Sequence, residues 1–202
     1  SGSGNVPQVM PTITVNADAA ASATSFTAKG NNALSITTGL VSNTTGALTI
    51  DASALKAQAA TVVSLDLDAV TVGTAGTITL TGSGGIDEIG VSAASPLSAS
   101  ASTINTGSGA DIIFTGAGAD TITGGAGTDG ITYTGGNDTL SGGAGVDTFS
   151  FTGALLAAND AASNTTTVDG GAGTDIVSIS TTGATIIDAE FDGFTSVETL
   201  TT

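Results

Sequence analysis

The feature that most constrains this chain is a run of five consecutive nine-residue units over residues 106–150. The units read TGSGADIIF, TGAGADTIT, GGAGTDGIT, YTGGNDTLS and GGAGVDTFS. Their sixth position is always an aspartate, namely Asp111, Asp120, Asp129, Asp138 and Asp147. Two positions later comes an apolar residue, namely Ile113, Ile122, Ile131, Leu140 and Phe149. A fixed period of this kind predicts stacked copies of one turn-and-strand unit rather than a globular core.

Two further copies of the unit lie outside the run. Residues 170–178 place Asp175 and Val177 in the same two roles, and residues 82–90 place Asp87 and Ile89 there. Asp147 and Asp175 are 28 positions apart, one more than three units. We therefore expect an insertion at about 151–168 that replaces two coil edges. Asp160 and Asp169 within it are either extra ligands or solvated acids.

Glycines before each aspartate permit a tight turn with positive φ, because they have no Cβ to clash. The turn is expected to aim backbone carbonyls and the carboxylate inward, and the next three residues form a short strand. The glycines concerned are Gly107, Gly109, Gly116, Gly118, Gly125, Gly127, Gly136, Gly143, Gly145, Gly171 and Gly173. Two units make one coil of 18 residues, which places Asp111, Asp129 and Asp147 along one edge and Asp120 and Asp138 along the other.

These units resemble the RTX (repeats-in-toxin) nonapeptide of calcium-binding β-rolls. The units depart from that pattern at their first or second positions, at Ser83, Thr106, Thr115, Tyr133 and Thr134. These departures bear on the affinity of individual sites rather than on the architecture. The resemblance implies several bound Ca²⁺ ions. It also implies an exported protein of the kind that includes toxins, proteases, lipases, adhesins and surface-layer proteins.

Calcium also suits the pattern on physical grounds. A row of aspartates along one edge is a row of like charges that needs a cation. Calcium takes six to eight oxygen ligands in flexible geometry, whereas magnesium demands a smaller octahedral site. The pairs Asp111/Asp129, Asp120/Asp138 and Asp129/Asp147 are expected to frame three sites. Asp87 and Asp175 complete the predicted metal-binding residues.

Charge divides the chain near Gly82. Residues 1–81 contain four acids and the only two bases, Lys29 and Lys56, whereas residues 82–202 contain 14 acids and no base. The net charge of −16 argues against nucleic acid and anionic membrane surfaces as partners. No apolar stretch is long enough to insert into a membrane.

Catalysis is not expected. The chain has no His and no Cys, which excludes imidazole and thiol chemistry, the usual zinc sites and disulfides. Asp87 and Glu88 are neighbours, so on a strand they point to opposite faces. Asp66 and Asp68 share a face, but no aromatic platform or base accompanies them.

Alternation of apolar and polar residues predicts strands, and alanine-rich segments predict two helices. The strand candidates are 6–15, 33–37, 47–50, 61–72, 77–81, 176–180, 184–188 and 194–202, and the helix candidates are 52–60 and 154–162. The fold class is therefore all-β. A parallel β-roll or β-solenoid with calcium-binding turns occupies residues 82–202 and ends in a strand segment. It follows a β-rich, sandwich- or helix-like region at 16–81 and an extended arm or edge strand at 1–15.

The leading functional hypothesis is a calcium-dependent structural subunit of an extracellular bacterial assembly, either a surface layer or a fibre. Its partners would be copies of itself and, at the cell surface, polysaccharide. The alternative is a folding and secretion, carrier or adhesin module of a larger RTX protein exported by type I secretion. Residues 6–15 either add as a strand to a neighbouring subunit or form an edge strand within their own chain.

Overall fold

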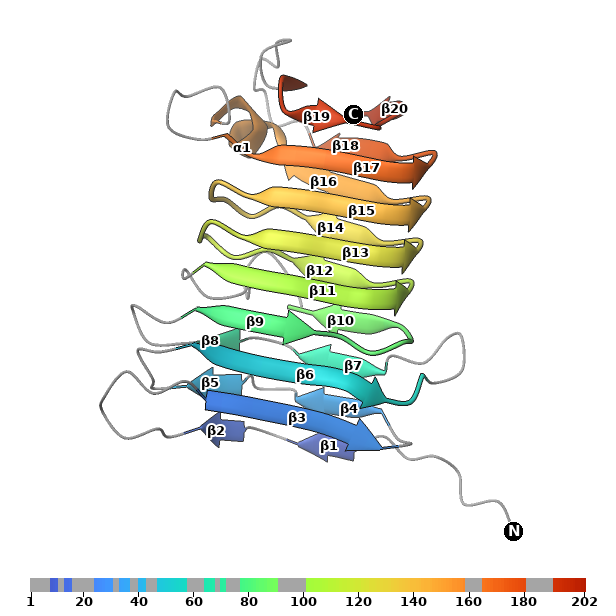
Figure 1. Ribbon diagram of the computed structural model, residues 1–202. Coiled ribbons are helices and arrows are strands. Elements are labelled where there is room, and N and C mark those ends of the chain that lie inside the picture. The colour runs from blue at the N-terminus through green and yellow to red at the C-terminus, as the bar shows by residue number, and fades with distance from the viewer. Residues whose placement is uncertain are drawn as a thin grey trace.

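The protein is a roll of stacked parallel strands (Figure 1). The computed structural model describes residues 8–10, 13–15, 24–30, 33–36, 40–42, 47–57, 64–67, 70–71, 77–90, 101–158, 165–180 and 191–202. Each described strand pairs in parallel with the strand one coil before or after it. The all-β, solenoidal fold class predicted from the sequence is confirmed.

The described strands form three sheets. The nine-stranded sheet contains, in spatial order, β1 (Gln8–Met10), β4 (Leu34–Ile36), β7 (Leu65–Leu67), β10 (Asp87–Ile89), β12 (Ile112–Phe114), β14 (Gly130–Thr132), β16 (Thr148–Thr152), β18 (Ile176–Ser180) and β20 (Thr199–Thr201). The eight-stranded sheet contains β19 (Phe194–Thr195), β17 (Thr167–Gly173), β15 (Thr139–Gly145), β13 (Thr121–Gly127), β11 (Ser102–Gly109), β9 (Ile78–Thr81), β6 (Leu48–Leu55) and β3 (Thr24–Gly30). A three-stranded sheet of β2 (Ile13–Val15), β5 (Leu40–Ser42) and β8 (Val70–Thr71) accompanies the first coils only.

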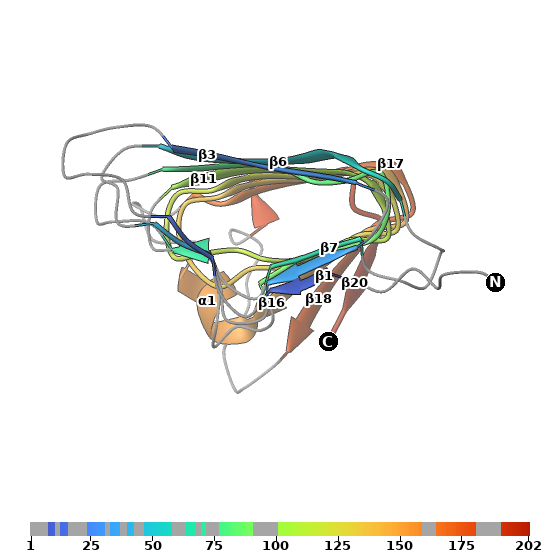
Figure 2. The same ribbon diagram turned by 90° about the horizontal axis from the view of Figure 1, so that it is seen from below.

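Two apolar rows run through the core, one on the inner face of each long sheet. Figure 2 shows these two sheets facing one another across the interior of the roll. In the nine-stranded sheet the row runs through Leu67, Ile89, Ile113, Ile131, Phe149 and Val177. In the eight-stranded sheet it runs through Ile50, Leu80, Ile104, Ile122, Leu140 and Val168. All of these side chains are at most 1% exposed. The apolar position of each nonapeptide therefore fills the interior, as the period predicted.

The N-terminal strands belong to the same stack. β1 pairs with β4 and β2 pairs with β5 within the chain. Residues 8–10 and 13–15, the described part of the predicted arm, therefore pair with strands of their own chain, and the addition of this arm to a neighbouring subunit stays a prediction. The sheets also continue across Gly82, because β7 pairs with β10 and β9 pairs with β11. The change of charge at this point is therefore not a break in the sheets.

The helix predicted over 52–60 is wrong for residues 52–55, which continue β6. Leu48, Ile50 and Ala52 alternate toward the interior and are 0% exposed. The packing of this strand outweighs the helical preference of alanine. Asp51 of the same strand accepts hydrogen bonds from the N–H and Oγ–H of Ser53, at 3.0 and 2.6 Å.

The insertion enlarges one coil and replaces one bend, not two coil edges as the sequence suggested. After β16, the short helix α1 (Gly153–Ala158) begins with the Leu155 N–H donating to Oγ1 of Thr152 at 3.2 Å. The helix predicted at 154–162 is thus confirmed as far as Ala158, and β17 resumes the eight-stranded sheet. Of the remaining predictions, Asp160 and the strand at 184–188 lie outside the described residues.

Candidate metal centre

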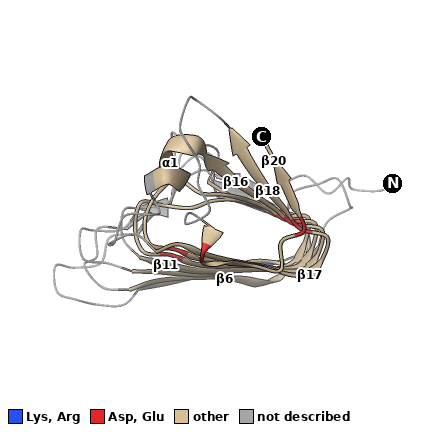
Figure 3. Ribbon diagram, turned by 90° about the horizontal axis from the view of Figure 1, so that it is seen from above, with Lys and Arg blue, Asp and Glu red and all other residues tan. Residues whose placement is uncertain are grey.

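The predicted aspartates lie in two stacks, one at each bend where the chain passes between the two long sheets (Figure 3). Strands of the eight-stranded sheet lead into the first bend, which carries Asp87, Asp111, Asp129, Asp147 and Asp175. Strands of the nine-stranded sheet lead into the second bend, which carries Asp120 and Asp138. All seven side chains are at most 2% exposed.

Hydrogen bonds join the aspartates of each stack into a ladder. The N–H of Asp111 donates to Oδ1 of Asp129 at 2.9 Å, and the N–H of Asp129 donates to Oδ1 of Asp147 at 2.8 Å. The same 2.8 Å contact joins Asp147 to Asp175, across the enlarged coil. On the second bend the N–H of Asp120 donates to Oδ1 of Asp138 at 2.9 Å. The N–H of Asp87 likewise donates to Oδ1 of Asp111 at 2.8 Å. The three pairs expected to frame sites are therefore neighbours, and Asp147/Asp175 and Asp87/Asp111 are a fourth and a fifth pair.

One oxygen of most of these carboxylates has no partner. Among the described residues, the buried Oδ2 atoms without a hydrogen bond belong to Asp111, Asp129, Asp138, Asp147 and Asp175. No lysine or arginine occurs in residues 82–202 to supply a counter-charge. A buried carboxylate without a partner is costly, so this arrangement calls for a cation.

Asp87 and Asp120 differ from the other five. Oδ2 of Asp87 accepts the Ser83 N–H at 2.6 Å, and its Oδ1 accepts the Ser83 hydroxyl at 2.6 Å. Oδ2 of Asp120 accepts the Gly116 N–H at 3.0 Å, and its Oδ1 accepts the Ser102 N–H at 2.7 Å. Protein donors therefore reach both oxygens of these two carboxylates.

Burial makes the charged form of these groups unfavourable. Desolvation raises the pKa of Asp87 and Asp138 to about 7 and that of Asp129 to about 6, with neighbouring aspartates adding to the shift. Desolvation likewise raises the pKa of Asp111, Asp120 and Asp147. Hydrogen bonds from backbone N–H groups oppose the shift without cancelling it. A bound cation would favour the charged form.

Glycines make room for these unpaired oxygens. A Cβ placed on Gly124 would lie 2.5 Å from Oδ2 of Asp129, and one on Gly142 would collide with Oδ2 of Asp147. Gly125, the next residue in its turn, has a φ of 112°, which L side chains rarely adopt. A Cβ there would collide with the Gly107 carbonyl of the preceding coil. Glycine thus lets both the carboxylate and the adjacent turn approach closely.

The donor set fits calcium. No group of three or more acidic, His or Cys side chains converges on one point within the described part of the chain. A cation between coils would therefore take two carboxylates at most, with the rest of its ligands from turn carbonyls and water. Calcium accepts such mixed oxygen ligands. The individual residue assignments, including the turn glycines, stay predictions.

The departures from the repeat pattern are accommodated by hydrogen bonds. The Tyr133 hydroxyl donates to the Gly136 carbonyl at 2.8 Å. The Thr134 hydroxyl donates to the Thr115 carbonyl at 2.6 Å, and the Thr106 hydroxyl donates to a carbonyl of the next coil. These side chains stabilise the turns that lack the usual glycine.

Three features of the ladders were missed from the sequence. Oγ1 of Thr166 accepts the Asp138 N–H at 3.2 Å, so a hydroxyl takes the next place on the second bend. Oε2 of the exposed Glu198 accepts the Asp175 N–H at 2.8 Å, so a glutamate takes the next place on the first bend. The first-position glycines Gly124, Gly142 and Gly170 were also overlooked. Thr166 follows Asp138 by 28 residues, as Asp175 follows Asp147, and this equal spacing was an available signal.

Asp169 and Asp192 are exposed, so of the two alternatives for Asp169 the structure favours the solvated acid. Asp188 and Glu190 lie outside the described residues.

The comparisons agree with the repeat geometry. Residues 99–131 and 134–152 match the family described as the RTX calcium-binding nonapeptide repeat (4 copies). The break between the two matches falls at Thr132 and Tyr133, where the pattern loses its first glycine. No curated protein and no solved structure matches the chain. Within the described part of the chain, no helix is long and apolar enough to cross a membrane. Residues 99–152 therefore carry RTX nonapeptide repeats, which bind Ca²⁺ in several turns and occur in exported proteins.

Proposed function

We propose that this chain is a calcium-dependent structural subunit of an extracellular bacterial assembly, a surface layer or a fibre. The observation that carries the proposal is the set of five buried carboxylate oxygens without a partner, in ladders that contain no base. These unpartnered oxygens destabilise the folded chain in the absence of a cation, and a bound cation would remove that cost.

Calcium would act as the switch between unfolded and folded acidic coils in the second part of the chain. Without it, the ladders place like charges one coil apart in a buried environment. With it, each ion bridges carboxylates of successive coils and compensates their charge. Extracellular calcium modules bind at roughly 10⁻⁴ to 10⁻³ M, so the chain would fold outside the cell and not in the cytosol. This coupling suits a protein that is exported unfolded.

The burial and hydrogen bonding of the acidic side chains support a structural role rather than a catalytic one. Asp87 is 0% exposed and hydrogen-bonded at both oxygens, whereas its neighbour Glu88 is half-buried on a different face. These two acids therefore cannot act together on one substrate. The other buried aspartates point into ladders rather than into a cleft. We propose on this basis that the chain is not an enzyme.

The alternative is a secretion, carrier or adhesin module of a larger exported protein. The RTX match supports it equally, because such repeats occur in many exported proteins. Polysaccharide, the second partner expected from the sequence, would have a candidate place in a pocket of about 260 Å³ beside α1. Thr132, Ser150 and Ser178 are among the residues that line that pocket.

The test is a calcium titration followed by circular dichroism and sedimentation velocity. The wild-type chain should gain β structure in millimolar calcium and then form large species. Asp129→Asn keeps the size of the side chain but removes a charge shared by two predicted sites. It should weaken calcium binding roughly 10-fold or more, since even loss of an outer-sphere partner costs about 10–100-fold.

Asp192→Asn is the matched control, because Asp192 is exposed in the last coil. Equal calcium responses from the two variants would contradict the ladder assignment. Calcium-dependent folding without association would favour the alternative module.

A further inference from the structure

The outer face of the eight-stranded sheet carries two rows of short polar side chains, which together are called the threonine face. Strand pairing aligns the members of each row from coil to coil, and every member of the first polar row is exposed. The first polar row consists of Ser25, Thr49, Thr79, Thr103, Thr121, Thr139 and Thr167. The second polar row lies two residues further along each strand, and its members are exposed or half-buried. It consists of Thr27, Asp51, Thr81, Asn105, Thr123, Ser141 and Asp169.

The nonapeptide does not by itself account for the first polar row. Thr121 and Thr139 each follow a ladder aspartate directly. The residues at the same repeat position on the nine-stranded sheet are Ile112, Gly130, Thr148 and Ile176. The preference of threonine for strands acts on both sheets, yet only one sheet carries the row. The row also continues through Thr49 and Thr79, which lie outside the nonapeptides.

The two polar rows form a flat, rectangular array. Neighbouring strands lie about 4.8 Å apart, and residues two apart along a strand are separated by about 6.6 Å. An ordinary sheet twists by about 20° from strand to strand, which would fan such rows out. Figure 2 looks along the stack and shows β3, β6, β11 and β17 lying nearly over one another. The polar side chains therefore repeat in two directions over the face.

The threonine face is accessible. Within the described part of the chain no strand or helix covers it, since α1 contacts β16 of the other long sheet (Figures 1 and 2). Hydroxyl groups at the bends are used differently, because those of Thr106 and Thr134 donate to carbonyl groups of neighbouring coils. The exposed hydroxyls of the first polar row face solvent instead.

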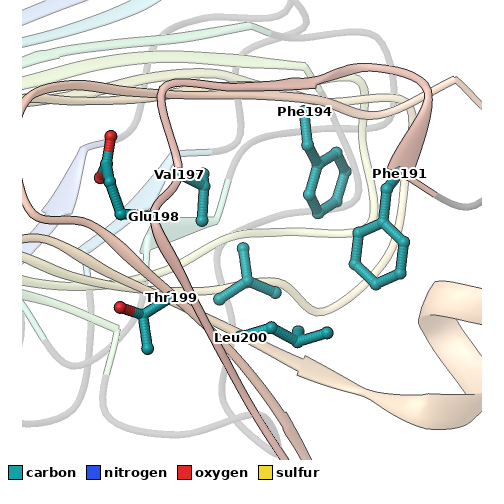
Figure 4. A pocket seen from close by; sticks show the side chains of 7 residues that line it. Phe191, Phe194, Val197, Glu198, Thr199 and Leu200 are labelled. Atoms are coloured by element: carbon teal, nitrogen blue, oxygen red, sulfur yellow. The ribbon is translucent and has the colours of Figure 1, made fainter.

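The composition of the face favours an uncharged ligand. The chain has a net charge of −16, yet β9, β11, β13 and β15 carry no charged residue in either polar row. Asp51 and Asp169 lie in the strands on either side of these four. Aromatic side chains, which could stack on sugar rings, are also absent from the two rows. Phe191 and Phe194 lie instead around a pocket in the last coil (Figure 4).

A ligand that contacts every coil must itself repeat at the spacing of the strands. The surface of an ice crystal does so, because its oxygen atoms form a regular array with spacings close to those of neighbouring strands and of alternate residues. Branching at Cβ restricts χ1 of threonine, so its hydroxyl and methyl groups are held in place before binding. Each contact is weak, but contacts made by one rigid face act together.

We propose that the threonine face binds ice, through a layer of water ordered by its hydroxyl and methyl groups. The inference goes beyond the proposed function. It depends only on the calcium-dependent folding of the acidic coils, because β11, β13 and β15 belong to these coils. The subunit role is not needed for it.

The experiment measures thermal hysteresis, the gap between the melting and freezing temperatures of a single ice crystal, for the full chain in millimolar calcium. The wild-type chain should show hysteresis and change the shape of the growing crystal. Thr121→Tyr places a bulky side chain in the middle of the first polar row and should abolish the hysteresis. Thr148→Tyr is the matched control, because Thr148 also follows a ladder aspartate but lies on the nine-stranded sheet. It should keep the wild-type hysteresis.

Circular dichroism of the same samples shows whether each variant folds. Thr103→Tyr is a second variant of the first polar row, and Thr103 is not adjacent to a ladder aspartate. It should fold with calcium like the wild-type chain and lose the hysteresis. Hysteresis that survives in folded Thr103→Tyr and Thr121→Tyr would overturn the inference. Equal loss in folded Thr148→Tyr would overturn it as well, because the effect would not depend on the face.

The failures of the two proposals are distinguishable. A wild-type chain whose circular dichroism does not respond to calcium contradicts the proposed function, and hysteresis in that sample would still support the inference. A wild-type chain that folds with calcium but leaves ice growth unchanged contradicts only the inference. Retention of that folded chain on crystalline cellulose or chitin would assign a crystalline polysaccharide to the face in place of ice.

Discussion

The coils before and after Gly82 share one core but differ in their bends. Ile50 and Leu80 are register partners 30 residues apart, whereas Ile104 and Ile122 are partners only 18 residues apart. All four are at most 1% exposed. The interior rows thus pass unchanged from long, nearly neutral coils to short, acidic ones.

This difference separates what shapes the roll from what makes it depend on calcium. Among the described residues, every buried carboxylate oxygen without a partner lies after residue 82. The acids described in the first part behave differently: Asp51 is hydrogen-bonded to Ser53, which lowers its pKa, and Asp66 is half-buried. The apolar rows therefore define the coil in both parts, whereas, among the described residues, the buried carboxylate oxygens that lack a partner all lie at the bends of the second part.

We expect the largest difference between the two parts of the roll when calcium is removed at neutral pH. We expect chelator to abolish hydrogen-exchange protection over residues 101–152, where the ladders lose the ions that offset their buried charge. Residues 47–55 should keep more of their protection, because β6 is buried through Leu48, Ile50 and Ala52 and carries no unpaired buried carboxylate. Hydrogen exchange with mass spectrometry measures both segments in one sample. Equal loss in both would show that the two parts fold as a single cooperative unit.

Acid should partly replace calcium. Because burial raises the pKa of Asp87 and Asp138 from 3.8 to about 7, and that of Asp129 to about 6, the folded chain binds more protons than the unfolded chain between these values. Without calcium, these groups favour the folded state at low pH, and this contribution is lost as the pH rises through about 6 to 7.

Thermal unfolding in chelator at about pH 5 and about pH 8 checks the sign. The calcium-free roll should be more stable at the lower pH, and calcium affinity should fall in the same direction because protons compete for the ligands. Greater stability at the higher pH without calcium would contradict the burial of these carboxylates.

Much of the fold could be predicted from the sequence, because each repeat unit marks a bend by its aspartate and the core by its apolar residue. The fixed interval from Asp111 to Asp147 predicted the ladders, and the residue two positions after each aspartate predicted the interior row. Outside the repeat, apolar alternation located strands but not corners. Residues 61–72 contain β7 and β8, which belong to different sheets, although their pattern reads as one strand. Only the neighbouring coils determine where such a segment bends.

The ladder ends were harder to predict for a related reason. Thr166 and Glu198 take ladder places without the nonapeptide pattern, since a hydroxyl or a longer carboxylate can accept the same N–H. Their places depend on how the preceding coils stack. By contrast, Asp87 matched the pattern, yet Ser83 supplies donors to both of its oxygens. The sequence thus predicts position on a bend better than it predicts which oxygens are left for a cation.

The smallest effect concerns the space around a single carboxylate. Gly142→Ala adds a Cβ that would lie 2.7 Å from Cγ of Asp147 and would collide with its unpaired Oδ2. We expect calcium affinity to fall about 10-fold, as for the loss of an outer-sphere partner.

Gly130→Ala is the control, because the nearest atom to its added Cβ is the Asp111 carbonyl oxygen at 3.9 Å. Since this site has room, alanine should leave affinity unchanged and alter stability by no more than about 1 kcal/mol. Calorimetric calcium titration of both variants measures the difference. Indistinguishable affinities would show that Gly142 is needed only for the path of the backbone. They would also show that the Asp147 carboxylate can move aside without losing its ion.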